Sequence, residues 1–444
     1  MPILFDATAA FAGLVGVWIN ECKKFRSEWM GYQLTNYPRI SIVIPVYNGA
    51  DSLANAVQSL RKQTFPPKQI EVIVVDNGST DETERIYLQQ QLLNTLGALH
   101  WISMPAKGKP WALNAGIHIA TGEFIANVDA DVSLHPSPLA NMVKAFRADP
   151  NLVAATGAIV LAPDDGKEKS PFRYMLQECE FIEYLMAFRV GHHYQTVANS
   201  IFTLAGAFSF FRRELLLNLP QYTNRTVFED TDITFPLRER LPDAGVACLA
   251  DAVAYVEPSH SLASVYSQLV RWQRGELEVA ACNPEALIKN LFSFLGMAPA
   301  RTLFIDHTLA FPRVVWTFVL SMMWLFGYAL PLVVSATMLM YACSMVVEGM
   351  TMFTCYLLVR GDTRARVKKH WWLVAVLPAY RFMLFWFRLS GFLTVLNEPA
   401  GWKTKAPWEQ AAEHVETLKQ RTREIGASTA MRLGSGVAWV KDLF

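Results

Sequence analysis

The chain of 444 residues carries a net charge of +1, and 52% of its residues are hydrophobic while 18% are charged. The near-neutral charge gives no support for a nucleic-acid-binding protein, and the apolar excess is high for a wholly soluble protein. The length predicts two or three domains, and the uneven distribution of apolar residues predicts membrane segments beside a soluble domain.

Residues 1–37 begin with a mostly apolar stretch that ends at Ile19 and is followed by Lys23, Lys24 and Arg26. The stretch is close to the length that crosses a bilayer, and the basic residues after it favour a cytosolic exit. No basic region precedes it and no clear cleavage site follows it, so a signal peptide is not expected. We predict a membrane anchor, spanning or interfacial, followed by a linker.

Residues 38–284 have the alternation of short and long periodic segments that is typical of an α/β domain. Short β-branched runs predict strands at 40–45, 70–75 and 123–128, and the longer stretches predict helices at 50–63 and 111–120. Buried strands separated by helices predict a parallel sheet with crossover connections. In such sheets ligands bind beyond the carboxyl ends of the strands, and polar residues gather at these points of the sequence.

Two polar clusters follow the first two predicted strands. One is Pro45-Val46-Tyr47-Asn48, and the other is the run Asp-Asn-Gly-Ser-Thr-Asp at 76–81. A carboxylate here can accept a hydrogen bond from the N–H of a pyrimidine base, while the turn residues let backbone donors approach. The same residue types also suit an ordinary turn, so both interpretations stay open at this point.

Asp129 and Asp131 follow the third predicted strand. Two carboxylates two residues apart on a bend can approach one site and hold Mg²⁺ or Mn²⁺, cations that keep water ligands and bridge substrate phosphates. A metal there would act as a Lewis acid for a leaving diphosphate. Such a pair is common without a metal, but its position at the carboxyl end of a strand favours the metal site.

Lys109 lies in the run Lys107-Gly108-Lys109-Pro110, just before a predicted helix. A lysine at a helix N-terminus suits an anionic phosphate, and the spacing of a Walker loop is absent. The alternative is a solvated basic turn.

Two further motifs lie later in the domain. The acids of Phe228-Glu229-Asp230 include a candidate general base for an acceptor hydroxyl, with helix capping as the alternative. Gln268, Arg271 and Trp272 share one face of a predicted helix and offer an amide, a guanidinium for phosphate and an indole for a sugar ring. The alternative for this helix is an amphipathic surface that meets lipid headgroups.

The C-terminal part predicts a membrane region over residues 313–396. Residues 285–312 predict interfacial helices, and residues 314–334 and 335–359 predict two spans that meet in a hairpin at 332–337. Basic residues at 313 and within 360–369 place both ends of the hairpin in the cytosol. Residues 371–396 contain Pro378, Arg381 and Arg388, so this segment is either interfacial, re-entrant or a third span. Residues 397–444 predict a polar cytosolic tail.

The order of these motifs is more specific than any one of them. PVYN, DNGSTD, KGKPWALNAG, DAD, FED and QLVRW, ahead of apolar helices, resemble the family-2 glycosyltransferases over about residues 38–280. The sequence is most similar in kind to the membrane-bound processive synthases of cellulose, hyaluronan and poly-N-acetylglucosamine, and to glycosyltransferases of bacterial exopolysaccharide clusters. The resemblance implies a Rossmann-like α/β domain of the GT-A fold, with interfacial and transmembrane helices. It also implies a multi-pass protein of the plasma membrane whose catalytic domain is cytosolic.

The resemblance also implies a role for each matching residue. The residues that would bind the nucleotide sugar are Pro45, Tyr47, Asp76, Lys109 and Asp129, with Asp76 at the uracil and Lys109 near the phosphates. Asp131 would hold Mg²⁺ or Mn²⁺, Asp230 would be the catalytic base, and the acceptor and diphosphate would be lined by Glu229, Gln268, Arg271 and Trp272. Asn77 stands where many relatives have a second Asp, and Phe228 replaces the common Thr of the TED triplet.

The function implied is that of an inverting hexosyltransferase that moves a sugar from a UDP-sugar to a growing polysaccharide. Its partners would be a glycan acceptor, membrane lipids and either further copies of the chain or a polysaccharide-export protein. The alternative is transfer of one sugar to a lipid, a glycolipid or isoprenoid carrier, because the QxxRW pattern occurs among relatives of both kinds. A catalytically inactive scaffold is disfavoured because Asp131 and Asp230 are both present.

Overall fold

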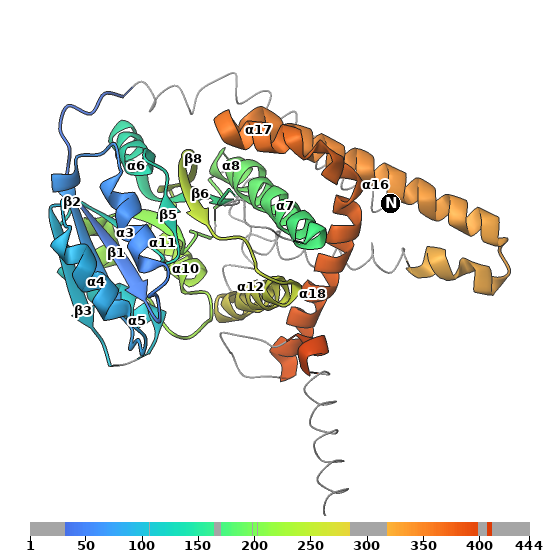
Figure 1. Ribbon diagram of the computed structural model, residues 1–444, viewed down its shortest axis with the longest axis horizontal. Coiled ribbons are helices and arrows are strands. Elements are labelled where there is room, and N and C mark those ends of the chain that lie inside the picture. The colour runs from blue at the N-terminus through green and yellow to red at the C-terminus, as the bar shows by residue number, and fades with distance from the viewer. Residues whose placement is uncertain are drawn as a thin grey trace, which may run out of the picture.

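The computed structural model describes residues 32–105, 107–163, 170–197, 199–201, 203–284, 318–397 and 406–410. The predicted N-terminal anchor, the predicted interfacial helices at 285–312 and nearly all of the predicted tail lie outside these residues. Figure 1 shows an α/β domain on one side and a group of C-terminal helices on the other.

An eight-stranded sheet of order β3-β2-β1-β4-β7-β6-β8-β5 forms the centre of the α/β domain. The strands are β1 (Ile40–Val46), β2 (Ile70–Asp76), β3 (Ala98–Ser103), β4 (Phe124–Val128), β5 (Ser133–Leu134), β6 (Leu152–Leu161), β7 (Phe208–Arg212) and β8 (Gly245–Val256). The predicted parallel pairing is confirmed from β3 to β4. Beyond β4 the sheet is mixed: β7 lies antiparallel to both β4 and β6, and β5 lies antiparallel to β8, whereas β6 and β8 pair in parallel. The helical connection from β6 to β7 begins and ends at the same end of these two strands, so β7 runs opposite to β6.

Helices cover both faces of this sheet. The helices of the domain are α3 (Leu53–Arg61), α4 (Thr83–Leu92), α5 (Lys109–Ile119), α6 (Pro138–Ala148), α7 (Pro171–Leu185), α8 (His192–Val197), α9 (Arg213–Asn218), α10 (Glu229–Asp232), α11 (Thr234–Arg240) and α12 (Leu262–Cys282). Of these, α12 packs mainly against the C-terminal helix α18 (Leu377–Asn397). All of β1 is buried, with Ile42 and Ile44 in the same hydrophobic cluster as Leu53 of α3, and Val43 in the cluster of Ile117 of α5. Each such aliphatic side chain stabilises the fold by about 1.5–3 kcal/mol, which explains why this strand is apolar on both faces.

The C-terminal region contributes α16 (Leu330–Leu358), α17 (Gly361–Lys369) and α18 (Leu377–Asn397), with the short helices η4 (Met323–Phe326) and η5 (Trp371–Ala375). The predicted break at 332–337 is wrong, because α16 continues without interruption through these residues. The chain turns earlier, at Gly327, whose φ of 90° is left-handed. A glycine suits that conformation, and Pro331 in the first turn suits a helix start rather than a break.

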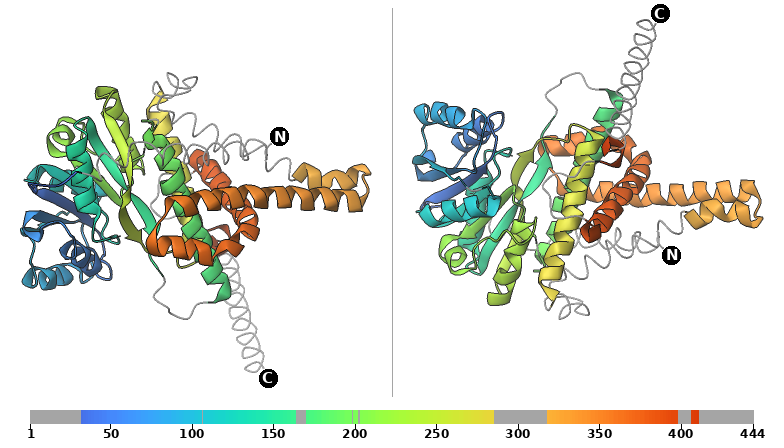
Figure 2. Two further views of the ribbon diagram at one scale, coloured as in Figure 1. Left: turned by 90° about the horizontal axis from the view of Figure 1, so that it is seen from above. Right: turned by 90° about the horizontal axis from the view of Figure 1, so that it is seen from below.

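Within the described residues, α16 is the one helix that is long and apolar enough to cross a membrane, and 6% of its most apolar 18-residue segment is buried. Its N-terminal half extends away from the rest of the protein together with η4 (Figures 1 and 2). Its C-terminal half packs against η5, α18 and η2 (Met186–Gly191), the π-helix that continues α7. We call residues 318–347, which contain no charged side chain, the apolar arm.

Ion pairs join the C-terminal helices to α7 of the α/β domain. Arg366 of α17 donates from Nη2 and Nε to the two carboxylate oxygens of Glu178, at 2.9 Å and 3.0 Å. Arg381 of α18 lies 2.7 Å from Glu348 of α16 and 3.2 Å from Glu183 of α7. Paired charges of this kind fix the relative positions of the elements that carry them, because separating them leaves a buried charge without its partner.

Candidate active site

The two polar clusters that follow β1 and β2 form one hydrogen-bonded surface. The N–H of Asn77 donates to the carbonyl of Val46 at 2.8 Å. The N–H of Asn48 donates to Ser79 Oγ at 2.9 Å, and Asn48 Oδ1 accepts from the N–H of Thr80 at 2.8 Å. Because β1 and β2 are parallel neighbours, their carboxyl ends bring these turns together, as the sequence predicted.

Asp76 is the last residue of β2, and its buried carboxylate accepts a hydrogen bond from the N–H of Ser79 at 3.0 Å. Pro45 lies on the neighbouring strand β1. Tyr47 follows that strand, is 48% exposed, and has its hydroxyl 3.2 Å from Lys107 Nζ. This corner of the sheet therefore presents a buried carboxylate beside an exposed ring and an ammonium.

Lys109 connects two acidic motifs that are far apart in the sequence. Its Nζ lies 2.7 Å from Oδ1 of Asp129, just after β4, and 3.1 Å from Oε1 of Glu229, the first residue of α10. Burial lowers the pKa of Lys109, but the charges of Asp129 and Glu229 outweigh burial and raise it above its usual value. The ammonium is therefore charged in this cluster and compensates the carboxylates around it.

Asp230 has both carboxylate oxygens held by backbone donors. Oδ2 accepts from the N–H of Gly206 at 2.9 Å, and Oδ1 accepts from the N–H of Thr231 at 2.7 Å. Burial and the neighbouring charge of Glu229 raise the pKa of Asp230 to about 6, with Lys109 opposing the shift. A Cβ at Gly206 would stand 3.1 Å from Lys109 Nζ and 3.2 Å from Asp230 Oδ2, so a side chain at this position would press on both charged groups.

Asp131 lies on the turn after β4 and is exposed, whereas Asp129 is partly buried. Burial raises the pKa of Asp129 to about 6, and Asp131 adds to this shift while Lys109 opposes it. Within the described part of the chain, the Asp131 carboxylate makes no hydrogen bond or ion pair, and no group of three or more His, Cys, Asp or Glu side chains is placed to hold a metal. One open carboxylate fits a cation such as Mg²⁺, which is commonly held by one or two carboxylates together with substrate phosphates and water.

Gln268 and Trp272 of α12 contact Tyr184 of α7. Gln268 Nε2 donates to the Tyr184 hydroxyl at 3.1 Å, and the ring of Trp272 lies edge-on at 6.0 Å between centroids. Burial raises the pKa of Tyr184, and the charges of Arg271 and Asp131 also act on its hydroxyl. Tyr184 therefore connects α7 to the α12 motif. The sequence analysis missed it, although an aromatic side chain on the polar helix before the FED triplet was a possible signal.

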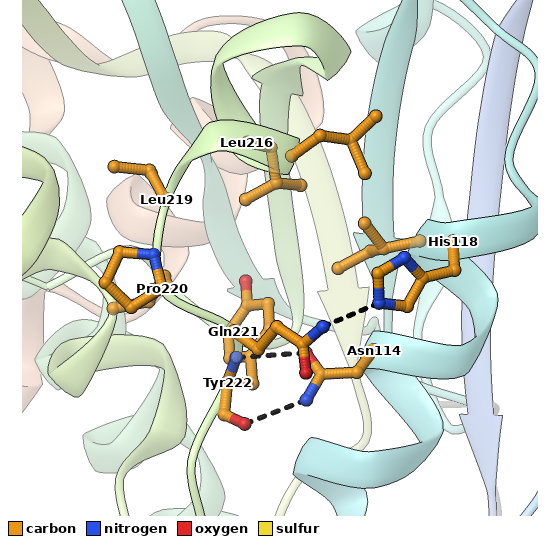
Figure 3. Close-up of a pocket in the computed structure, with 10 residues that line it drawn as sticks. Asn114, His118, Leu216, Leu219, Pro220, Gln221 and Tyr222 are labelled. Carbon is orange, nitrogen blue, oxygen red and sulfur yellow. Dashed lines mark hydrogen bonds between the residues drawn. The ribbon is translucent and has the colours of Figure 1, made fainter.

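Asn114 of α5 fixes the loop that precedes α10. Its Nδ2 donates to the carbonyl of Tyr222 at 2.8 Å, and its Oδ1 accepts from the N–H of Tyr222 at 2.9 Å (Figure 3). The Tyr222 hydroxyl accepts from Asn127 Nδ2 of β4 at 2.9 Å. The cavity beside this loop, about 30 Å³ in volume, has room for water but not for a sugar ring. The sequence analysis also missed these residues, because only the fold brings them together.

Residues 41–219 match the family model described as glycosyl transferase family 2. We therefore call residues 41–219 the family 2 domain, after the family model that they match. The poly-beta-1,6-N-acetyl-D-glucosamine synthase of Staphylococcus epidermidis is 25% identical over 241 residues, which are 54% of this chain and 55% of that protein. The protein of the same name from Staphylococcus aureus strain MSSA476 is 24% identical over 254 residues, 57% of each chain. The chain thus spans little more than half the length of these curated relatives.

The fold of the family 2 domain is also found in solved structures. The mannosyltransferase PcManGT from Pyrobaculum calidifontis, solved in complex with GDP-Man and Mn²⁺, aligns with a TM-score of 0.51 and 19% identity. The alignment covers 90% of this chain and 100% of that one. The family 2 domain therefore has the GT-A fold.

The family match ends before α10 begins. It includes the turns after β1, β2 and β4 and the residues of α5. Glu229, Asp230 and the α12 residues lie beyond the matched range, and the structure connects them to the family 2 domain through Lys109 and Tyr184.

Proposed function

We propose that this chain transfers a sugar from a UDP-sugar to a growing polysaccharide, with inversion at the anomeric carbon, at the cytosolic face of the plasma membrane. The main support is that Asp129 and Glu229 both form ion pairs with Lys109, because these pairs bring the DAD and FED motifs into one site at the carboxyl end of β4. The name of the curated relatives, poly-beta-1,6-N-acetyl-D-glucosamine synthase, supports a polysaccharide product.

In this proposal, the nucleotide binds across the turns after β1 and β2. Asp76 accepts from the uracil N–H, while Pro45 and Tyr47 line the base and ribose. Asn77 does not take the place of a second nucleotide-binding Asp, because its Oδ1 accepts from the N–H of Gly108 at 2.8 Å. Asn77 instead connects the base site to the loop that carries Lys109.

Asp131 would hold a divalent cation, Mg²⁺ or Mn²⁺, beside the site of the donor diphosphate. When bound, the metal supplies a Lewis acid for the leaving diphosphate. The open carboxylate of Asp131 supports this assignment, as does the Mn²⁺ in the complex of the mannosyltransferase with the same fold. Lys109 and Arg271 offset the remaining negative charge on the diphosphate.

Asp230 acts as the general base. With a pKa of about 6 it is largely ionised near neutral pH, and it accepts the proton of the acceptor hydroxyl. The acceptor oxygen bonds to the anomeric carbon from the face opposite the diphosphate, the bond from that carbon to the diphosphate breaks, and UDP leaves. Glu229 is the poorer base because it is paired with Lys109. Gln268 and Trp272 hold the acceptor sugar.

The apolar arm inserts into the bilayer in this proposal. Residues 330–347 of α16 span about 27 Å, which matches a hydrocarbon core of about 30 Å. Burial of Glu348, the first charge after the arm, against Arg381 supports a boundary there. α18 runs crosswise to α16 (Figure 1) and exposes Phe382 and Trp386, so we place it at the membrane interface rather than across the membrane.

One observation favours transfer of a single sugar to a lipid as a second candidate. α18 packs against α12, with Tyr266 and Ser390 hydroxyls 2.6 Å apart. The proposed acceptor residues therefore lie on a helix in contact with the proposed interfacial helix, and a lipid-linked acceptor can approach from the bilayer. The size of the product separates the two candidates.

The test is UDP release by the full chain in lipid with Mn²⁺ or Mg²⁺, screened over UDP-sugars, with GDP-mannose as a second nucleotide. We expect Asp230→Asn to lose about 10²–10⁴-fold in turnover and to keep nucleotide binding by calorimetry. Asp243→Asn, an exposed loop position, is the matched control. Full turnover in Asp230→Asn would overturn the assigned base. Absence of both turnover and nucleotide binding in the wild type would overturn the function itself.

A further inference from the structure

Two lysines and two tryptophans are exposed together where α17 ends and η5 begins. Lys368 and Lys369 are the last residues of α17 in sequence and are exposed. Trp371 and Trp372, the first residues of η5, are 44% and 48% exposed. Large aromatic side chains that are exposed side by side form an apolar patch, and such patches mark interaction sites more often than scattered apolar residues do.

These four residues lie beside the C-terminal end of the apolar arm. The Tyr341 hydroxyl of α16 donates to the carbonyl of Ala375 in η5 at 2.7 Å. A Cβ at Gly349 of α16 would stand 3.7 Å from Val374 of η5. η5 therefore packs along α16 between residues 341 and 349, where the charge-free segment ends.

The segment that carries the four side chains is attached to α7 on its opposite side. Arg366 of α17 pairs with Glu178 and lies 3.8 Å from the ring centroid of Phe181. His370, which separates Lys369 from Trp371, is buried with its Nε2 2.6 Å from the Tyr174 hydroxyl. Because Arg366 and His370 hold one side of this segment to α7, the lysines and tryptophans between and beyond them face outward.

We propose that Lys368, Lys369, Trp371 and Trp372 form a binding surface for the anionic phospholipid headgroups of the leaflet on the catalytic side. The inference rests on the membrane association proposed above and adds a lipid class to it. Indole side chains favour the boundary between headgroups and acyl chains, and lysine side chains near an anionic surface are attracted to it. Within the described residues, neither lysine forms an ion pair, and the acid on α17 is Asp362, at the opposite end of the helix.

A protein partner with an acidic surface offers similar charges but does not explain the position. The surface is continuous with the apolar arm, and it lies at the level where a membrane-inserted arm would leave the hydrocarbon. This continuity favours the bilayer as the occupant.

The experiment compares lipids that the full chain retains. Protein in detergent is mixed with equal amounts of phosphatidylglycerol and phosphatidylcholine, and the lipids that remain after gel filtration are counted by mass spectrometry. We expect enrichment of phosphatidylglycerol in the wild type, by up to about fivefold for each lysine. K368Q/K369Q should lose the enrichment and K368R/K369R should keep it, while W371A/W372A should retain less of both lipids.

The matched control is K62Q/K68Q, which removes two exposed lysines of the α/β domain. Equal retention of the two lipids by the wild type, as an acidic protein partner would predict, overturns the proposal. So does unchanged enrichment in K368Q/K369Q, provided that its melting temperature equals that of the wild type. The lipid count does not depend on turnover. Enrichment without UDP release would therefore contradict the proposed function and leave the lipid surface standing.

Discussion

The ring of Phe228 lies directly against Gly275 of α12, where a Cβ would stand 2.6 Å from Phe228 Cγ. Phe228 immediately precedes the acids of α10, and Gly275 follows Trp272 on the next turn of α12. The contact therefore sets the distance between the proposed base and the proposed acceptor residues. It also gives a structural reason for the phenylalanine that replaces the usual threonine: the ring fills the space that the glycine leaves open.

Gly275→Ala should lower both stability and turnover, because an added methyl group in a packed contact costs about 1–3 kcal/mol. Phe228→Ala should destabilise the chain as well, by leaving a cavity. The double variant should melt higher than the sum of the two losses predicts, because each change relieves the other. Thermal unfolding and UDP release measure both effects, and strictly additive losses would mean that the contact does not couple the two elements.

The pH dependence of kcat/KM should report the ionisation of Asp230. Its pKa is raised to about 6, and the reaction needs the ionised form, so kcat/KM should rise with pH through about 6 and level off above it. Glu229→Gln removes a negative charge that raises this pKa, so the rise should move to lower pH. The exposed Glu214→Gln should leave the profile unchanged. An unmoved profile in Glu229→Gln would show that another group controls the rise.

Metal dependence should distinguish Asp131, the proposed metal ligand, from Asp129, which pairs with Lys109. EDTA should abolish UDP release, and added Mn²⁺ or Mg²⁺ should restore it. Asp131→Asn should raise the half-saturating metal concentration by at least about tenfold. Lys109→Met, which removes the cation paired with Asp129, should reduce turnover without that shift. Equal metal requirements in the wild type and Asp131→Asn would contradict the assigned ligand.

The two hydrogen bonds between Asn114 and the backbone of Tyr222 should contribute to the stability of the fold. Asn114→Ala removes two hydrogen bonds and leaves a backbone N–H and a carbonyl of Tyr222 without their partner, at a cost of about 2 kcal/mol. Tyr222→Phe removes only the bond from Asn127 and should cost about 1 kcal/mol. Denaturant unfolding measures both values, and a larger loss in Tyr222→Phe would contradict the order.

The sequence predicted the local structure well where one pattern dominates. The strands β1, β2 and β4 are short runs of apolar and β-branched residues, and the structure places each within a residue of its predicted bounds. The helix expected from residue 50 begins at Leu53 instead. The N–H groups of Gly49 and Ala50 bond to Thr83 at 2.9 Å and Asp81 at 3.1 Å, which holds these two residues in a turn.

Long-range relationships were beyond sequence reasoning. The motifs predicted the acids at 129 and 229, but not that both would contact Lys109, because that depends on how β4, α5 and α10 converge. The π-helix after Tyr184 carries no sequence pattern of its own. The antiparallel direction of β7 was equally hidden, since its apolar composition suits either direction.

The pair formed by Glu178 and Arg366 has a consequence for biosynthesis. The two residues are separated by 188 positions, so at about 5–20 residues per second the ribosome makes the guanidinium about 10–40 s after the carboxylate. During this interval the apolar arm, which lies between them in the sequence, is also synthesised. Arg366 can therefore pair with Glu178 of α7, the helix that carries Tyr184, only after the arm has left the ribosome. In the proposed membrane topology, the arm is thus available for insertion before Arg366 can pair with Glu178, and a polypeptide that stalls before residue 366 has the sequence motifs but lacks this pair.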